Sequence, residues 1–397
     1  MEPLRVLVIG ASTLQLPAIE TAQRMGYIVG AVDQNSQAVG ASVADQFFEV
    51  STTDSDGVVA VAAQFRPSGV LTMGTDLPMR SVAAVCEALG LPGPSRASAY
   101  AATDKGLMAE AFNRFSVPAP RAAVCSSEEE LRRAIDAWPV PFILKPVDSS
   151  GSRGVKLLHD LSGLREAFDY SMASSRDGRV IAQEYLQGQE VSVEGFVIHG
   201  RVHVVAVTDK ITTGPPHFVE MGHTQPSAVG VHMLEKIQRL VVLSVQALGL
   251  DHCAVHAEMM VTSDGPRMIE IGARLGGDFI TSHLVSLSTG VDMVEALVEI
   301  SLGLEPQLDR RFDRASAIRF LAALSPDIAE PRAIEELQRI PGVEAIHIES
   351  THDQRQIRSS VDRLGHVIVG ADTRQEAEAN ADRVLRLIRG VEQEGGS

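Results

Sequence analysis

MIEIGARLGGD, residues 268–278, places two charges in a stretch that otherwise has the composition of a buried strand. Side chains alternate along a strand, so Glu270 and Arg274 lie on the same face. A charge that is buried without a partner is costly, and this face must therefore meet compensating groups. The stretch predicts a strand that carries a carboxylate and a guanidinium into a buried polar site and then ends at a Gly276-Gly277 turn.

The residues before this stretch complete a hairpin. A second apolar run covers 253–261, and Asp264-Gly265 is a turn signal between the two runs. With a three-residue loop over 263–265, Glu258 lies directly opposite Glu270. Like charges in that position destabilise a strand pair, whereas a hard divalent cation such as Mg²⁺ between them reverses the sign. A register slipped by one residue, with one carboxylate in solvent, is the alternative that the hairpin leaves open.

The whole-chain composition narrows the class of protein. The 397 residues are enough for two to three domains, with 45% hydrophobic and 22% charged residues, as in ordinary globular proteins. A net charge of −16 argues against nucleic acid or an anionic membrane as the main partner. Cys86, Cys125 and Cys253 lie far apart and indicate neither a disulfide framework nor a cysteine-rich metal site. We find no apolar run of membrane-spanning length and no signal-peptide pattern, and we expect a cytoplasmic protein.

The first ninety residues alternate predicted strands and helices, which is typical of a Rossmann-like parallel layer. Strands are expected at 4–10, 27–33 and 69–74, and a helix at 81–90. Gly10 ends the first strand and Asp33 the second, as in dinucleotide-binding proteins. The G-x-G-x-x-G fingerprint is absent, because the positions two and five after Gly10 are Ser12 and Gln15. We therefore expect this layer to be a scaffold rather than an NAD site.

Beyond a Pro- and Gly-rich linker at 90–98, the pattern changes to helices and hairpins. Ser126 and Glu129 have the spacing of a capping box, and His199-Gly200 is a second hairpin signal. Asp292 and Glu295 open another helix. The predicted elements in this part are helices near 104–115, 233–248, 291–303 and 373–390, and strands near 141–147, 154–160, 180–186, 190–207, 253–272, 317–322 and 365–371.

Several polar positions are ambiguous when each is taken alone. Lys145 interrupts an apolar strand and either meets an anion or extends to the strand end; Lys105 begins a helix, where an anion or plain exposure explains it. DSSGSRGV (148–155) is a backbone anion nest or a hairpin connection, and it is not a Walker loop. AQEYLQGQE (182–190) is a purine-binding hinge or a connector. His256 is expected to be a hydrogen-bonded structural histidine rather than a metal ligand.

Together and in this order, these segments resemble the ATP-grasp superfamily over essentially the whole chain. ATDKGLM and FILKPVDSSGSRGV resemble its two lysine segments with the phosphate-covering loop. QEYLQGQEVSVEG resembles the adenine hinge with the ribose carboxylate. AEMMV and RMIEIGARLGGD resemble the Mg²⁺-binding hairpin with the catalytic arginine. Gly272 departs from the pattern, because many members carry Asn there, and this puts full binding of a second metal ion in doubt.

The resemblance implies a role for each matched residue. Nucleotide binding falls to Lys105, Lys145, Ser150, Gly151, Ser152, Gly154, Gln183, Glu184, Leu186 and Glu190. Glu258 and Glu270 would ligate Mg²⁺, with Mn²⁺ as the alternative ion, and Arg274 would stabilise the reacting groups. His217, Glu220, His223, Gly276, Gly277 and Asp278 are substrate candidates, with Asp278 expected to receive the ammonium group of an amine. The expected parts are a Rossmann-like pre-ATP-grasp domain at 1–95, a lid and small subdomain at 96–185, a catalytic subdomain at 186–314 and a closing domain at 315–397.

The implied activity is that of an ADP-forming ligase that joins a carboxylate, expected to be an amino acid, to an amine through an acyl-phosphate. TDKITTGPPHFVEMGHTQPSAV (208–229) resembles the segment found in L-amino acid ligases, which make dipeptides. The partners are then small molecules, and a homodimer through the N-terminal layer is implied by the same resemblance. A biotin-carboxylase-like or nucleotide-biosynthesis enzyme is the first alternative, and a non-catalytic nucleotide-binding protein is the second.

Overall fold

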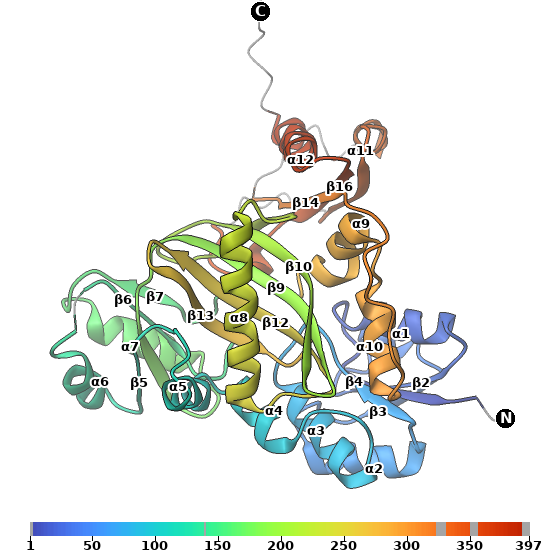
Figure 1. Cartoon of the computed structure of the whole chain (residues 1–397), viewed down its shortest axis with the longest axis horizontal. Coiled ribbons are helices and arrows are strands. Elements are labelled where there is room, and N and C mark those ends of the chain that lie inside the picture. The colour runs from blue at the N-terminus through green and yellow to red at the C-terminus, as the bar shows by residue number, and fades with distance from the viewer. Residues whose placement is uncertain (1–2, 139, 323–330, 350–355, 391–397) are drawn as a thin grey trace, which may run out of the picture.

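The computed structural model describes residues 3–138, 140–322, 331–349 and 356–390 and contains three sheets (Figure 1). The first sheet is parallel, with the order β3-β2-β1-β4. Val6 and Val8 pack into one core and Leu7 and Ile9 into another, so both faces are buried, as a parallel sheet requires. Its elements are β1 (Arg5–Ile9), α1 (Leu16–Arg24), β2 (Ile28–Asp33), η1 (Val39–Ala41), β3 (Gln46–Glu49), α2 (Ser55–Phe65), β4 (Gly69–Leu71) and α3 (Pro78–Leu89).

The second sheet is small and antiparallel, with the order β5-β8-β6-β7. Leu131 of α6 and Leu164 of α7 are fully buried in its core, so these two helices cover the sheet. Helices α4 and α5 lead into it from the N-terminal layer (Figure 1). The elements are α4 (Arg96–Thr103), α5 (Lys105–Arg114), β5 (Ala122–Cys125), α6 (Glu128–Ile135), β6 (Phe142–Pro146), β7 (Lys156–Leu158), α7 (Leu164–Ala173) and β8 (Val180–Glu184).

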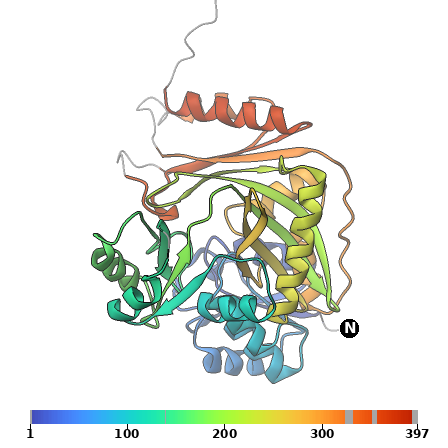
Figure 2. The same ribbon diagram turned by 60° about the vertical axis from the view of Figure 1, so that its left-hand side comes forward.

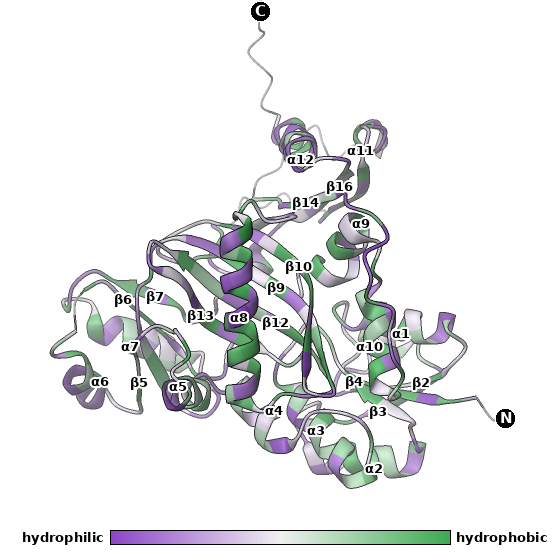
Figure 3. Cartoon of the chain, viewed as in Figure 1, coloured by the Kyte–Doolittle hydropathy of each residue, from purple (hydrophilic) through white to green (hydrophobic). Residues whose placement is uncertain are grey.

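The third sheet has eight antiparallel strands in the order β13-β12-β9-β10-β11-β14-β16-β15. Helix α8 packs on it with an apolar face that includes Ile237 and Val241, and presents hydrophilic residues outward (Figure 3). The strands are β9 (Gln189–Ile198), β10 (Arg201–Thr212), β11 (Glu220–Gln225), β12 (Cys253–Thr262), β13 (Gly265–Gly272), β14 (Ala315–Phe320), β15 (Val343–Ile348) and β16 (Gly365–Ala371). The helices are α8 (Val231–Leu248), η2 (Ile280–Leu284), α9 (Val285–Thr289), α10 (Met293–Ser301), α11 (Pro331–Gln338), η4 (Ser360–Asp362) and α12 (Arg374–Ile388).

The large sheet joins the middle of the chain to its C-terminal part. Strand β11 pairs with β14, and β14 with β16, so the strands after residue 314 continue the same sheet (Figure 2). Helix α10 packs against both α1 and β4, and its residues share one core with the N-terminal strands. The domain boundaries expected from the sequence remain a proposal. In the part of the chain that the structure describes, no helix is long and apolar enough to cross a bilayer.

Two local predictions need correction. The N-cap of α6 is Ser127, whose hydroxyl accepts from the Glu130 amide at 3.2 Å, one residue later than the predicted Ser126 and Glu129 pair. The β12–β13 loop has two residues, since Thr262 pairs with Gly265, and not the three assumed above. A β-bulge after Glu258 shifts the register by one residue. The bulge therefore restores the predicted pairing of Glu258 with Glu270.

Candidate active site

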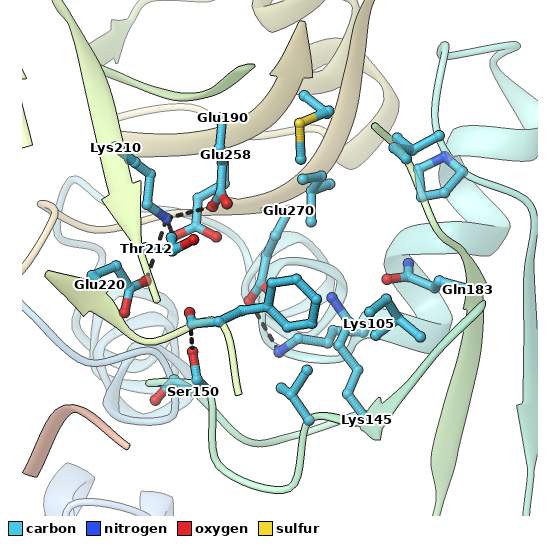
Figure 4. A pocket seen from close by; sticks show the side chains of 18 of the residues that line it. Lys105, Lys145, Ser150, Gln183, Glu190, Lys210, Thr212, Glu220, Glu258 and Glu270 are labelled. Carbon is cyan, nitrogen blue, oxygen red and sulfur yellow. Dashed lines mark hydrogen bonds and ion pairs between the residues drawn. The ribbon is translucent and has the colours of Figure 1, made fainter. Parts of the chain in front are cut away.

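A cavity of about 470 Å³ lies between the small sheet and the large sheet. It is lined by the 149–153 loop, the 183–190 connection, the end of β10 and the β12–β13 hairpin (Figure 4). The chain has five lysines, and three of them, Lys105, Lys145 and Lys210, line this cavity. Nearly all the other basic residues of the chain are arginines. This concentration of compact ammonium groups marks the cavity as a site for anionic oxygens.

Lys105 is held in place by the start of α5. Asp104 caps the helix by accepting hydrogen bonds from the amides of Gly106 and Leu107 at 2.8 and 3.0 Å. The Lys105 ammonium then reaches Glu270 Oε1 at 3.1 Å and donates to the Ser149 carbonyl at 2.7 Å. Burial would lower the pKa of Lys105, but the carboxylates of Glu270 and Asp76 outweigh it and raise the pKa. Lys105 therefore remains charged.

Lys145 is different, because it makes no ion pair with any residue that the structure describes. It projects from β6 into the cavity and is 8% exposed (Figure 4). Burial lowers its pKa. A buried ammonium without a partner is costly, and a bound anion would remove that cost. Lys145 thus indicates a ligand with negative charge.

Lys210 is a third cavity lysine, and it was not among the residues predicted from the sequence. It lies on β10 and its side chain is 2% exposed. Its ammonium contacts Glu190 at 2.8 Å, Glu220 at 3.3 Å and Glu258 at 3.2 Å (Figure 4). Burial alone would lower the pKa of Lys210, but these carboxylates raise it well above its ordinary value. Its position in the apolar run VVAVTDKIT was a signal of the same kind as that for Lys145.

Glu258 and Glu270 face each other across β12 and β13, as predicted. Burial favours the neutral acid at Glu258, but Lys210 and then His256 oppose it and hold the pKa of Glu258 well below its ordinary value. His256 hydrogen-bonds to Glu258 at 3.1 Å and to the fully buried Glu194 at 2.7 Å. Despite burial, Glu194 raises the pKa of His256 to about 9. The prediction of a hydrogen-bonded histidine is confirmed, whereas Glu194 was not foreseen.

Arg274 meets a residue from the N-terminal layer. Its Nε donates to Asp76 Oδ1 at 2.8 Å, and its Nη1 donates to the Leu275 carbonyl at 3.2 Å. A Cβ on Gly272 would lie 3.0 Å from Asp76 Oδ1 and 3.3 Å from Arg274 Nε, so glycine leaves room for this pair. Asp76 also lines the cavity. The N-terminal layer is therefore more than the scaffold predicted from sequence, because it supplies a carboxylate to the site.

The 148–155 loop folds over the cavity between β6 and β7. Gly151, Ser152 and Gly154 have φ values of 66°, 59° and 74°, left-handed values that glycine adopts at little cost and that serine adopts rarely. Ser152 Oγ donates to the Phe218 carbonyl at 3.1 Å, and the Arg153 guanidinium donates to the Ser150 carbonyl at 2.9 Å. The loop thus covers the cavity through a few side-chain contacts.

The 183–190 connection forms the opposite wall. Gln183 and Leu186 are buried there, and Glu184 Oε2 accepts from the Arg121 amide at 3.2 Å. Glu184 also pairs with Arg267 at 3.4 Å. These contacts fix the backbone of the connection. Its amide and carbonyl groups are held at the cavity edge.

Of the six substrate candidates, Glu220 lines the cavity and the other five do not. His223 is 1% exposed, and neither of its ring nitrogens forms a hydrogen bond. Asp278 is engaged by Arg363, with oxygen–nitrogen distances of 2.8 and 2.7 Å. This contact lowers the pKa of Asp278 despite its burial. The Asp278 carboxylate is therefore already paired.

A second cavity of about 310 Å³ adjoins the first on the side of the N-terminal layer. Asp76, Lys105 and Glu270 line both cavities. Thr52, Thr75 and Arg176 are among the residues that line the second cavity alone. The charged centre of the site thus lies where two chambers meet.

Comparisons with known proteins identify two regions. Residues 138–282 match the ATP-grasp domain family, and residues 319–391 match the L-amino acid ligase C-terminal domain 2 family. The alanine–anticapsin ligase of Bacillus subtilis is 29% identical over 266 residues, which are 61% of this chain and 56% of that protein. The chain thus spans only about half of that relative's length.

Solved structures share the fold over nearly the whole chain. The L-amino acid ligase from Bacillus licheniformis superposes with a TM-score of 0.80 at 19% identity, covering 97% of each chain. N5-carboxyaminoimidazole synthetase from Staphylococcus aureus, complexed with ADP, gives a TM-score of 0.77 at 15% identity and covers 96% of this chain and 97% of that one. At these identities the likeness shows the fold, a mixed α/β architecture of the ATP-grasp type.

Proposed function

We propose that this chain, an ATP-dependent ligase with an ATP-grasp domain and an L-amino acid ligase C-terminal domain, joins an amino acid to an amine. A carboxylate oxygen of the acid attacks the γ-phosphorus of ATP, ADP leaves, and an acyl-phosphate forms. The amine nitrogen then attacks the acyl carbon, and phosphate and a proton are released. The observation that carries this proposal is the meeting of three lysines, two opposed glutamates and Arg274 around one cavity.

Phosphate binding is assigned to the lysines and the 148–155 loop. Lys105 and Lys145 hold the α- and β-phosphates, and the amides around Ser150–Gly154 close over the β- and γ-phosphates. We add Lys210 to this set, because its ammonium lies beside Glu258 at 3.2 Å. Preorganised positive groups stabilise charge that develops on a transferring phosphoryl group. The unpaired state of Lys145 supports this assignment.

The hinge and the ribose site follow from the opposite wall. Gln183 meets the adenine amino group, and the backbone of Glu184 and Leu186 completes the hinge. The contacts of Glu184 with Arg121 and Arg267 support this role because they leave the backbone groups in fixed positions. Glu190 holds the ribose hydroxyls.

The donor set fits Mg²⁺. Two carboxylates, Glu258 and Glu270, leave positions for phosphate and water oxygens, which Mg²⁺ prefers. Among the described residues, no group of three or more histidine, cysteine, aspartate or glutamate side chains could hold a metal ion. The ion would therefore be held by these two glutamates together with phosphate oxygens of the nucleotide, and it would neutralise the charge of the phosphoryl group. Mn²⁺ has the same ligand preference.

Arg274 stabilises the acyl-phosphate and the tetrahedral species that follows it. A guanidinium can hold two oxygens at once, and Asp76 fixes the orientation of this one through Nε. Asp76 also neutralises Arg274 in part, so that the group binds its oxyanion without an excess of buried charge. Asp76 is thus a positioning residue in this proposal.

The substrates are proposed to occupy the junction of the two cavities. The printed names of similar proteins, which include alanine–anticapsin ligase and carnosine synthase, support an amino acid as one substrate. Glu220 is the substrate candidate that lines the cavity, and His217, His223, Gly276 and Gly277 remain candidates on the surrounding segments. We no longer assign the ammonium of the amine to Asp278, because Arg363 already occupies its carboxylate. A homodimer remains part of the proposal.

One experiment tests the function directly. Purified protein is incubated with ATP, Mg²⁺ and all amino acids in pairs, and products are identified by mass spectrometry alongside phosphate release. We expect an amide whose mass equals the sum of the two substrates less water, with one phosphate released per amide. Phosphate release only with bicarbonate or a phosphoribosylamine would instead favour a carboxylase or nucleotide-biosynthesis ligase. No phosphate release with any acceptor would contradict the ligase proposal.

A further inference from the structure

A strained turn follows β13. The strand predicted to carry Arg274 ends earlier, at Gly272, and Arg274 lies two residues beyond it in the segment that leads to this turn. Asp278 and Phe279 have φ values of 51° and 62°, so two consecutive residues with side chains adopt the left-handed conformation. Such residues are disfavoured there and persist only where the surroundings fix them. Local hydrogen bonds give part of this support, since the Thr281 hydroxyl donates to the Gly276 carbonyl at 2.7 Å. The remaining support must come from elsewhere in the chain.

That support comes from the C-terminal part of the large sheet. Arg363, two residues before β16, binds both carboxylate oxygens of Asp278, at 2.8 and 2.7 Å. Its guanidinium carbon lies 3.7 Å from the ring centroid of Phe320 on β14, and its side chain is 13% exposed. The His366 ring lies 4.1 Å from the Phe279 ring. Both strained residues are thus held by side chains from the matched C-terminal domain.

Arg363 also contacts two segments that border the cavity. Its Nη1 donates to the Glu220 carbonyl at 3.4 Å, at the start of β11. Its Nε donates to the Ser360 carbonyl at 2.8 Å. Ser360 lies beside the 148–155 loop, because a Cβ on Gly151 would be 3.0 Å from the Ser360 hydroxyl. One side chain therefore joins the turn after Arg274, the strand of Glu220 and the segment next to the loop.

We propose that Arg363 is a positioning residue, which holds the Gly276–Phe279 turn and the start of β11 so that Arg274 and Glu220 keep their places around the substrates. The link to catalysis rests on the proposed function. Arg363 touches neither reacting group, and the nucleotide wall at 183–190 is not among its contacts. Its loss should therefore affect the chemical step and leave nucleotide binding unchanged.

The variants are Arg363→Leu, Asp278→Asn and their combination, with Arg314→Leu as the matched control. Arg314 also forms an arginine–aspartate pair, with Asp372 at 3.0 Å, but its side chain is 46% exposed and it is not among the residues that line the cavity. Asparagine tolerates the left-handed conformation and removes only the charge. Two readouts are used: hydrogen exchange of 273–284, which needs no activity, and the separation of kcat from the ATP dissociation constant.

For Arg363→Leu we expect faster hydrogen exchange in 273–284 and unchanged exchange in 183–190. The ATP dissociation constant should stay the same. The kcat should fall by about tenfold or more, because small displacements at a reacting centre have effects of that size. The loss in the double variant should be smaller than the sum of the two single losses, because both changes break the Arg363–Asp278 contact; Asp278→Asn in addition weakens the pair of Asp278 with His223 at 3.6 Å. Arg314→Leu should match the wild type in every readout.

Unchanged exchange in 273–284 would overturn the inference, as would a kcat equal to that of the wild type. Weaker ATP binding with normal kcat would also overturn it, because Arg363 would then act on the nucleotide. If the wild type itself forms no product, the proposed function fails, while the exchange measurement still decides whether Arg363 holds the turn.

Discussion

Glu258 and Glu270 face each other across the β12–β13 hairpin, and each carboxylate is bound by a different lysine, Lys210 at 3.2 Å and Lys105 at 3.1 Å. The two lysines come from different elements, one from β10 of the large sheet and the other from the start of α5. Without nucleotide and Mg²⁺, the two ammonium groups thus balance the negative charge of Glu258 and Glu270. Binding of Mg²⁺ at the proposed site requires these carboxylates to exchange the lysines for the metal ion.

Lys210→Gln tests this exchange. Three carboxylates lose their shared cation, so the free energy of unfolding should fall by roughly 1–3 kcal/mol. Added Mg²⁺ should restore part of the loss, because the carboxylates are then free to bind it, whereas it should hardly stabilise the wild type. Thermal unfolding with and without Mg²⁺ measures both effects. Lys236→Gln, an exposed lysine on α8, is the control, and an equal response of the two variants would contradict the prediction.

Glu270→Gln should abolish turnover while the protein stays folded. The amide keeps the shape of the side chain but is a poor ligand for a hard cation, and it no longer pairs with Lys105. Adenosine should still bind through the hinge, so its dissociation constant should equal that of the wild type. Turnover within a few-fold of the wild type at saturating Mg²⁺ would exclude Glu270 as a metal ligand.

The 148–155 loop should become protected when nucleotide binds. Arg153 lies in it and is exposed, so trypsin should cut there in the free protein. A non-hydrolysable ATP analogue should slow this cleavage, because the loop amides then bind phosphate oxygens. Cleavage at Arg310, which is exposed and does not line the cavity, serves as the internal control. If both sites are cut at the same rates with and without the analogue, the loop is no lid.

Arg274→Lys and Asp76→Asn should lower kcat with little change in ATP affinity. Lysine cannot hold two oxygens as a guanidinium does, and a lost oxyanion donor typically reduces kcat by about 10²–10³-fold. Asp76→Asn leaves Arg274 in place but weakens its anchor, and it should therefore have the smaller effect. The measurements are kcat and the ATP dissociation constant. Loss of ATP binding with normal kcat would place Arg274 on the nucleotide.

His366 should make the C-terminal contact sensitive to acid. Burial lowers the pKa of His366 to about 4, below its ordinary value of 6.5. The folded state therefore favours the neutral ring, and its contribution to stability is present above pH 6.5 and is lost as the pH falls towards 4. The charged and titratable groups that face this ring are His347, His283, Arg363 and Asp278.

His366→Phe keeps a ring against Phe279 but cannot be protonated. Its melting temperature should fall less than that of the wild type between pH 6.5 and 4, and the two curves should run parallel above pH 6.5. Parallel curves over the whole range would show that this histidine does not contribute to acid sensitivity.

The sequence predicted those parts of the site that local patterns encode. Alternation along the two strands, with a turn signal at Asp264-Gly265, predicted that Glu258 and Glu270 face each other, and the pattern of 104–115 predicted a helix that begins near Lys105. The loop length was wrong, because a bulge is invisible in a hydrophobic pattern, but the bulge and the shorter loop compensate each other at Glu258.

Residues that reach the site through tertiary contacts could not be predicted in this way. Asp76 and Arg274 are 198 positions apart, and no periodicity connects them. Arg363 precedes β16, which is separated from β10 in the sheet by β11 and β14. It lies 85 positions from Asp278 in the sequence, so the contact between them exists only in the folded chain. Lys210 is the exception, since a lysine inside an apolar strand is as visible as Lys145 was.

The pairing of β11 with β14 bears on how such enzymes diversify. The C-terminal part cannot be cut off and exchanged as a free module, because its removal would expose the open edge of β11 to aggregation. A graft from a related ligase would have to bring a matching strand edge and a partner for position 278. Recombination between such genes should therefore exchange the C-terminal strands and the turn at 276–279 together rather than separately.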